Sequence, residues 1–166
     1  TNGDGYDDIV VLSAYYPLGI RIGRATLYYG APVSPSTSPA WTFNAPTNGG
    51  PFVQGMVAPA GDINLDGYAD FLIGAPGYVN GQSGEGAVLL FHGAPNSPST
   101  TASVILEGGV GGQAMGNSVA TAGDVNGDGF ADIVSGAQTL PSGSTPSRAF
   151  LFYGGGAGGL SRLPRQ

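Results

Sequence analysis

An acidic loop that recurs at a fixed interval constrains the fold of this chain more than any other feature. Asp4, Asp66 and Asp128 are separated by steps of 62 residues, and the same steps separate Asp8, Asp70 and Asp132. The residues around the loops repeat as well, since Ala60-Gly61-Asp62 matches Ala122-Gly123-Asp124. Self-similarity at such a period is typical of architectures in which each unit buries its faces against its neighbours. The repeat runs through the whole 166-residue chain.

Each unit reads as four short strands separated by turns. Apolar stretches rich in β-branched and aromatic residues, bounded by Gly and Pro, are typical of strands. They recur at 9–12, 71–73 and 133–134, then at 25–29, 87–92 and 149–153, at 41–43 and 104–106, and at 56–60 and 118–122. Four antiparallel strands per repeat of this size predict all-β blades of a β-propeller, because one such sheet cannot bury both faces alone.

The length gives about 2.7 repeats of 62 residues in one domain, residues 1–166. We expect the first unit at about 1–45, lacking its inner strand, the second at about 46–107, and the third at about 108–166, lacking its outer strand. A propeller closes with about four to eight blades. The sequence therefore predicts a partial propeller, or a ring completed by other chains, and of these the segment of a longer propeller is favoured.

Composition excludes several classes of protein. The chain has 31 Gly and 13 Pro among 166 residues, which disfavours helices, and no apolar run nears the ~18 residues of a membrane span. There is no lysine, and the five arginines are outnumbered by eleven acids for a net charge of −6. Phosphate binding needs clustered basic residues, so a nucleic-acid partner is not expected. Membrane insertion is not expected either, because the chain lacks a long enough apolar run. The absence of cysteine removes thiol catalysis and disulfides.

The loops follow the pattern D-x-N-x-D-G-x-x-D, which predicts calcium sites. It sets side-chain oxygens at positions 1, 3, 5 and 9 and a backbone carbonyl at position 7, and Ca²⁺ takes six to eight oxygens in flexible geometry. A turn needs only one or two such residues, so three copies in register favour metal ligands over plain turn formers. The predicted ligands are Asp62, Asn64, Asp66, the carbonyl of Tyr68 and Asp70; Asp124, Asn126, Asp128, the carbonyl of Phe130 and Asp132; and, in a first loop whose position 1 would precede Thr1, Asn2, Asp4, the carbonyl of Tyr6 and Asp8.

These loops, with Gly74-Ala75-Pro76 after the second and Gly30-Ala31-Pro32 in the first unit, resemble the FG-GAP repeats of the integrin α-subunit β-propeller and its bacterial relatives. The Phe-Gly pair of that family is Met115-Gly116 in the third unit and Val53-Gln54 in the second, which is a departure from the pattern. The resemblance implies a seven-bladed, calcium-bearing, extracellular propeller that serves adhesion or ligand recognition. It also implies that the metal loops stabilise the blades while other loops bind ligands.

Catalytic candidates are few. The only histidine, His92, takes a place that holds Tyr29 and Tyr153 in the other units, so packing is favoured over general base catalysis. Glu85 and Glu107 are non-equivalent and are expected to be exposed turn residues. Tyr15, Tyr16 and Tyr78 follow the first strand of their units and are candidates for a ligand-binding surface, and the alternative is that they pack between blades.

We therefore expect a non-catalytic, calcium-binding recognition or adhesion module at the cell surface or outside the cell, with a protein or glycan ligand. Two alternatives stay open: an architectural part of a larger surface protein, and a carbohydrate-binding or carbohydrate-active protein on the same scaffold.

Overall fold

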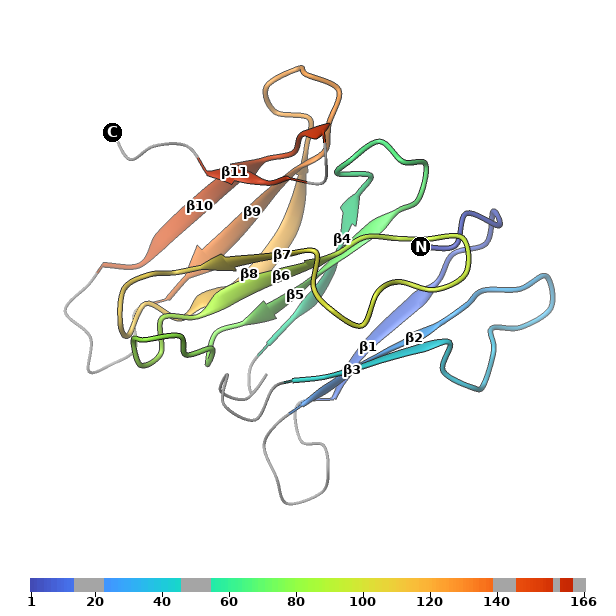
Figure 1. The fold of residues 1–166 in the computed structure, drawn as a ribbon, viewed down its shortest axis with the longest axis horizontal. Helices are drawn as coiled ribbons and strands as arrows, with labels where there is room; N and C mark the ends of the chain where they lie inside the picture. Colours follow the sequence, from blue (N-terminus) through green and yellow to red (C-terminus); the bar gives the residue numbers. More distant parts are fainter. Residues whose placement is uncertain (14–22, 46–54, 139–145, 157–158, 163–166) are drawn as a thin grey trace.

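The computed structural model describes residues 1–13, 23–45, 55–138, 146–156 and 159–162, and it contains three antiparallel sheets (Figure 1). The first has the order β1-β2-β3, the second β4-β5-β6-β7, and the third β8-β9-β10-β11. The strands are β1 (Ile9–Ser13), β2 (Arg24–Tyr28), β3 (Trp41–Asn44), β4 (Val57–Gly61), β5 (Asp70–Ala75), β6 (Ala87–Phe91), β7 (Val104–Glu107), β8 (Met115–Gly123), β9 (Asp132–Ala137), β10 (Arg148–Tyr153) and β11 (Ser161–Arg162).

This architecture confirms the predicted all-β chain of propeller-type blades. Each predicted apolar stretch lies in or overlaps a strand, and neighbours in sequence pair antiparallel within a sheet. The register repeats with the sequence, since Ile9 faces Tyr28, Phe71 faces Phe91, and Ile133 faces Phe152. The third unit does carry the start of a fourth strand, because the two residues of β11 pair with Phe152 and Tyr153 of β10.

A cluster of aromatic rings joins the first and second sheets. Trp41 of β3 is 4% exposed, and its ring lies edge-on to Phe71 and Phe91 with centroids 5.3 and 5.1 Å away. Phe71 and Phe91 stack on each other across the β5–β6 pair. Such pairs add roughly 0.5–1.5 kcal/mol to the gain from burial alone. Trp41 is therefore a packing residue between these two sheets.

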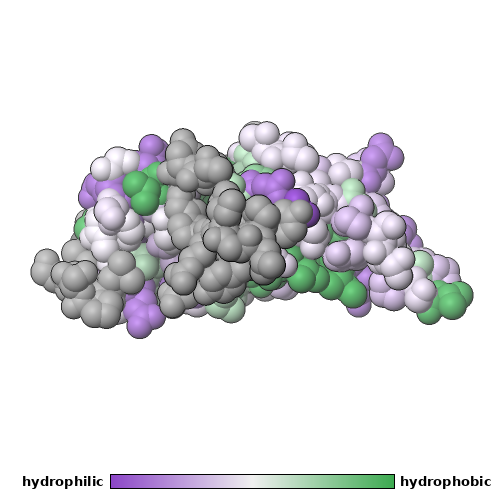
Figure 2. Space-filling model, turned by 90° about the horizontal axis from the view of Figure 1, so that it is seen from below, coloured by the Kyte–Doolittle hydropathy of each residue, from purple (hydrophilic) through white to green (hydrophobic). Residues whose placement is uncertain are grey.

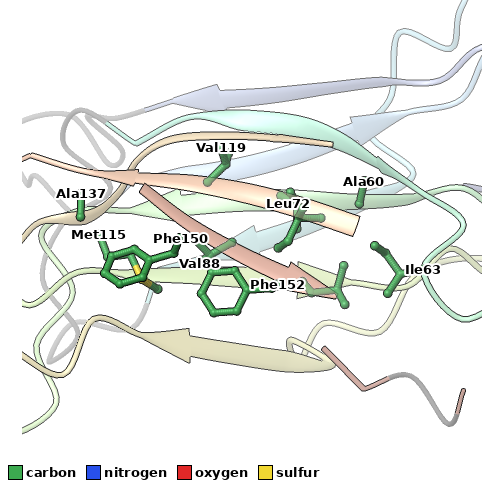
Figure 3. Close-up of a cluster of buried hydrophobic side chains, with 11 residues drawn as sticks. Ala60, Ile63, Leu72, Val88, Met115, Val119, Ala137, Phe150 and Phe152 are labelled. Carbon is green, nitrogen blue, oxygen red and sulfur yellow. The ribbon is translucent and has the colours of Figure 1, made fainter. Parts of the chain in front are cut away.

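A second cluster fills the space between the second and third sheets (Figure 3). Phe150 and Phe152 of β10 reach it from one side, and Leu72 and Val88 reach it from the other. Successive side chains of a strand point to opposite faces of its sheet. The strands β5 and β6 therefore contribute side chains both to this cluster and to the cluster shared with the first sheet. The middle sheet is consequently buried on both sides, and every residue of β5 and β6 is buried.

Two glycines allow β5 and β8 to approach closely. A Cβ placed on Gly74 would overlap the carbonyl oxygen of Gly116, and a Cβ on Gly116 would overlap the carbonyl oxygen of Ala87. Gly116 also has a φ of +85°, a conformation that glycine adopts without strain. Gly116 belongs to the Met-Gly pair and Gly74 to the Gly-Ala-Pro triplet. The two most recognisable motifs of the repeat are therefore in contact across the interface between sheets.

The surface is mixed in character. Figure 2 shows hydrophilic residues spread over one long face, with small hydrophobic patches between them. In the described part of the chain, no helix is long and apolar enough to cross a membrane.

Candidate metal loops

The three acidic loops lie beside one another at one end of the sheets. The second and third connect β4 to β5 and β8 to β9, and the first leads into β1. A Cβ on Gly3 of the first loop would lie 3.0 Å from the ring of Tyr68 in the second. A Cβ on Gly61, at the start of the second loop, would lie 2.9 Å from Ala131 in the third. Neighbouring loops are thus in contact.

The same hydrogen bonds shape positions 3, 5 and 7 of all three loops. At position 5, one carboxylate oxygen accepts the backbone N–H of position 7, and the other accepts the side-chain amide of position 3. In the second loop, Tyr68 N donates to Asp66 Oδ1 at 2.9 Å and Asn64 Nδ2 donates to Asp66 Oδ2 at 2.9 Å. The corresponding pairs join Tyr6 and Asn2 to Asp4, and Phe130 and Asn126 to Asp128.

The aspartate at position 1 closes the loop from its other side. Asp62 accepts the backbone N–H groups of Asp66 and Gly67 at 3.1 and 2.9 Å. Asp124 accepts those of Asp128 and Gly129 at 3.1 and 2.8 Å. Each of these loops therefore turns its backbone around one carboxylate, as the spacing of the motif requires.

The aspartate at position 9 has a role that the sequence reasoning missed. Asp132 accepts the N–H of Val125 at 2.7 Å and that of Gly154 at 2.9 Å, which ties the loop to the end of β10. Asp70 does the same with Ile63 and Gly93 at 2.9 and 2.8 Å. Asp8 accepts Gly30 N at 2.9 Å. The recurrence of Gly30 and Gly93 at one place in the repeat was the only sequence signal for this contact.

Sterics explain why glycine stands at these three positions. A Cβ on Gly93 would come within 2.6 Å of the carbonyl oxygen of Ala69, the residue before Asp70. A Cβ on Gly154 would overlap the carbonyl oxygen of Ala131 in the same way, and one on Gly30 would overlap that of Asp7. The close approach lets the glycine N–H reach the carboxylate.

Burial divides the ligand candidates into two groups. Asp70 and Asp132 are buried, whereas Asp66 and Asp128 are exposed. Burial raises the pKa of the Asp70 carboxyl, although the hydrogen bonds from Gly93 and Ile63 oppose that shift. At the exposed Asp4, the backbone N–H of Tyr6 and the side chain of Asn2 hold the pKa below its usual value.

The donor set of each loop fits a hard cation such as calcium, because every predicted ligand atom is an oxygen. In the second loop, Asp62 Oδ1 and Oδ2, Asp66 Oδ1 and Oδ2 and Asn64 Oδ1 each accept one hydrogen bond, and an sp² oxygen has two lone pairs. One lone pair per oxygen is thus left for a metal. The described residues do not contain three acidic, His or Cys side chains gathered closely enough to form a ready metal cluster.

His92 lies beside this region. Its Nδ1 is 3.2 Å from Asp70 Oδ2, and its side chain is 18% exposed. The histidine therefore neighbours a carboxylate that is already bound to two backbone amides.

The two glutamates lie at the end of the second sheet that is opposite the metal loops, and the expectation that they are exposed turn residues is wrong. Glu85 is 1% exposed and Glu107 is half-buried, so neither is an exposed turn residue. Asn80 joins them: its backbone N–H donates to Glu85 Oε1 at 2.5 Å, and its side chain donates to Glu107 Oε1 at 2.7 Å. The carboxylates fasten the β5–β6 turn to the end of β7, which their separation in sequence did not indicate.

Of the three candidate ligand-binding tyrosines, Tyr15 and Tyr16 lie outside the described residues. Tyr78 is half-buried, packs against the first hydrophobic cluster, and donates its hydroxyl to Glu107 Oε1 at 3.4 Å. These contacts give Tyr78 a packing role beside any part in ligand binding.

Comparison with known proteins agrees with this geometry. The model of the FG-GAP repeat matches residues 55–91 and 115–158. Integrin alpha-IIb of Mus musculus is 32% identical over 145 residues, which is 82% of this chain and 14% of that protein. Integrin alpha-3 of Cricetulus griseus is 35% identical over 113 residues, or 68% of this chain and 10% of that protein.

A protein of another description shares the similarity. The phosphatidylinositol-glycan-specific phospholipase D of Mus musculus is 32% identical over 118 residues, which is 66% of this chain and 14% of that protein. The chain thus spans about a seventh or less of the length of these relatives. The matched units are the ones whose loops, glycines and four-stranded sheets are described above. The chain belongs to the FG-GAP repeat family of integrin α-like β-propeller proteins.

Proposed function

We propose that this chain is a calcium-stabilised part of a propeller that acts, without catalysis, in adhesion or ligand recognition outside the cell. The observation that carries the calcium proposal is the threefold recurrence of one oxygen set with one hydrogen-bond pattern. Four carboxylate or amide side chains at fixed offsets exceed what a turn needs. In the second loop, the side-chain oxygens at positions 1, 3 and 5 each keep one lone pair that a cation can use.

Calcium would be bound by the position 1, 3, 5 and 9 side chains and the position 7 carbonyl of each loop. The second and third loops have all five groups, and the first has four of them. Bound calcium supplies charge neutralisation, because each complete loop holds three carboxylates. The chain's own residues orient the ligands through the backbone hydrogen bonds at positions 1 and 9, so the loop fold and the ligand set support each other.

A thermal melt in calcium and in a chelator tests this proposal. A ligand at about 100 times its dissociation constant stabilises the folded state by about 2.7 kcal/mol per site. We expect a higher melting temperature in calcium, and the Asp66→Asn, Asp128→Asn double variant should lose the part of that gain that comes from the second and third loops. Asn at these positions keeps an acceptor for the N–H of Tyr68 or Phe130 but removes the charge.

Asp7→Asn is the matched control, because Asp7 is an exposed loop acid outside the ligand positions. It should respond to calcium like the unmodified chain. Coincident melts of the unmodified chain with and without chelator would show that the loops are plain turns.

Recognition of a protein or glycan rests on the similarity to integrin α-subunits and on the loops at both ends of the sheets. The architectural and carbohydrate-active alternatives predict different results on an array of glycans and extracellular proteins. Selective retention of one class supports recognition, binding to nothing supports architecture, and turnover of a sugar supports an enzyme.

A further inference from the structure

The turn between β5 and β6 contains an asparagine–glycine pair, Asn80-Gly81, at the end of the second sheet that is opposite the metal loops. Both residues are exposed, and neither belongs to a strand. Gly81 has a φ of +94°, and a Cβ at this position would meet no atom within 4 Å. The backbone that follows the asparagine is therefore open to solvent and sterically unhindered.

The glycine of this pair recurs in the repeat, but the asparagine does not. One repeat earlier the sequence has Leu18-Gly19, and one repeat later it has Ser142-Gly143. The asparagine is thus specific to the second unit, where it forms a tether to β7. Its side-chain amide donates to Glu107 Oε1 at 2.7 Å, and the hydroxyl of Tyr78 donates to the same oxygen at 3.4 Å.

An asparagine followed by glycine can react within its own backbone. The nitrogen of Gly81 attacks Cγ of Asn80, so that the N–Cγ bond forms and the Cγ–Nδ2 bond breaks. Ammonia leaves with the proton that the Gly81 N–H gives up. Water then opens the five-membered succinimide, adding a hydroxyl group to one carbonyl and a proton to the ring nitrogen, and the product is aspartate or isoaspartate. Glycine favours the attack because it has no Cβ to block the approach.

A second exposed pair of this kind, Asn126-Gly127 in the third metal loop, is held differently. Gly127 N donates to Asp124 Oδ1 at 2.7 Å, and Asp128 N donates to Asn126 Oδ1 at 3.0 Å. These bonds restrain both the attacking nitrogen and the carbonyl group. Among the described residues, neither Gly81 N nor Asn80 Oδ1 has a hydrogen-bond partner. The pair at Asn80 is therefore freer to reach the geometry of attack.

We propose that Asn80 is a site of spontaneous deamidation, and that the reaction turns the tether to β7 into a repulsive contact. In the aspartate product, an oxygen replaces the amide nitrogen that faces Glu107 Oε1, and like charges at that separation repel. Glu85, which is 1% exposed and accepts the backbone N–H of Asn80, is a third carboxylate at this place. The turn is then released from β7. No metal takes part, so the site does not depend on the calcium proposal.

Incubation of the 166-residue chain in mildly alkaline buffer, followed by peptide mass spectrometry, tests the site. The exchange of an amino for a hydroxyl group marks deamidation, and isoaspartyl methyltransferase labels the isoaspartate product. We expect Asn80 to convert on the order of tenfold faster than Asn126, because the restrained pair reaches the near-attack geometry less often. In denaturant the two rates should be equal, and the rate at Asn80 should be the same in calcium and in chelator. Conversion of Asn80 no faster than that of Asn126 in the folded chain would overturn the proposal.

Three variants test the consequence for the fold. Asn80→Asp mimics the product, and Ser83→Asp adds the same charge at another exposed residue of the turn. We expect amide exchange in Val104–Glu107 to become faster in Asn80→Asp and to stay unchanged in Ser83→Asp. Adding Glu107→Gln to Asn80→Asp should restore slow exchange, because its amide can donate to the new carboxylate. Unchanged exchange in Asn80→Asp, or no rescue by Glu107→Gln, would contradict the repulsive contact.

Discussion

The backbone of Gly74 in β5 lies directly against the backbone of Gly116 in β8, and neither position has room for a side chain. This contact brings the inner part of the third sheet onto the second, so Leu72, Val88 and Phe152 can close their cluster. Gly116 N also donates to Ser135 Oγ at 3.1 Å, which fixes the β8 side of the contact. The spacing between two blades is therefore set by glycine and not by a large side chain.

The Gly74→Ala variant tests this spacing. Its added methyl group would overlap the carbonyl oxygen of Gly116, which is backbone and cannot rotate away. Overpacking of this kind costs about 1–3 kcal/mol. We therefore expect the free energy of unfolding to fall by about 1–3 kcal/mol, which a lower urea midpoint would report. Gly155→Ala is the control: its nearest contact would be 3.5 Å, and its cost should stay within about 0.5 kcal/mol. Equal midpoints for the two variants would contradict the steric argument.

A stabilising substitution is expected at Leu65, in position 4 of the second loop. Its φ is +58°, whereas Gly3 and Gly127 hold the equivalent positions with φ of +73° and +76°. The left-handed conformation costs a non-glycine residue roughly 1–2 kcal/mol. Leu65 is 55% exposed, so little packing is lost with its side chain.

We therefore expect Leu65→Gly to raise the free energy of unfolding by about 0.5–1 kcal/mol in thermal or urea denaturation. Val125→Gly, in the third loop, removes a side chain of similar exposure without relieving a positive φ, and it should destabilise the chain. A loss of stability in Leu65→Gly would mean that its side chain contributes more than the strain costs.

The strands and the loops could be predicted from the sequence because both depend on local rules. Alternation and turn residues placed β5 and β9, and the offsets from Asp62 to Asp70 placed the loop atoms. Contacts between segments that are distant in the sequence could not be predicted in this way. Glu85 and Glu107 are 22 residues apart and look unrelated, yet both hydrogen-bond to Asn80. The bond from Gly93 to Asp70 likewise appears only after β6 folds back beside β5.

The position 9 aspartates should matter for folding even without metal. Asp132 is fully buried, and Asp132→Ala would leave the N–H groups of Val125 and Gly154 without their acceptor. Hydrogen bonds to a charged group contribute about 1.5–3 kcal/mol each, so we expect a loss of about 3 kcal/mol or more in chelator. Asp132→Asn keeps one acceptor oxygen and should lose less.

Asp128→Ala is the matched comparison, since Asp128 is an exposed acid of the same loop. In chelator it should cost about 1 kcal/mol or less, because its hydrogen bonds are replaced by water. If Asp132→Ala and Asp128→Ala are equally mild in chelator, position 9 is a metal ligand without the structural role described above.

Tyr78 should make the fold sensitive to alkaline pH. Burial raises the pKa of its hydroxyl, and the nearby carboxylates of Glu107 and Glu85 raise it further. A tyrosine whose pKa is higher in the folded than in the unfolded chain contributes stability below the unfolded value of about 10, and this contribution is lost as pH rises through the folded pKa. We therefore expect the urea midpoint to fall from pH 9 to pH 11, and to fall less steeply in Tyr78→Phe. Glu107→Gln removes one charge beside the hydroxyl and should also flatten the slope; parallel slopes in all three chains would show that Tyr78 titrates alike in the folded and unfolded states.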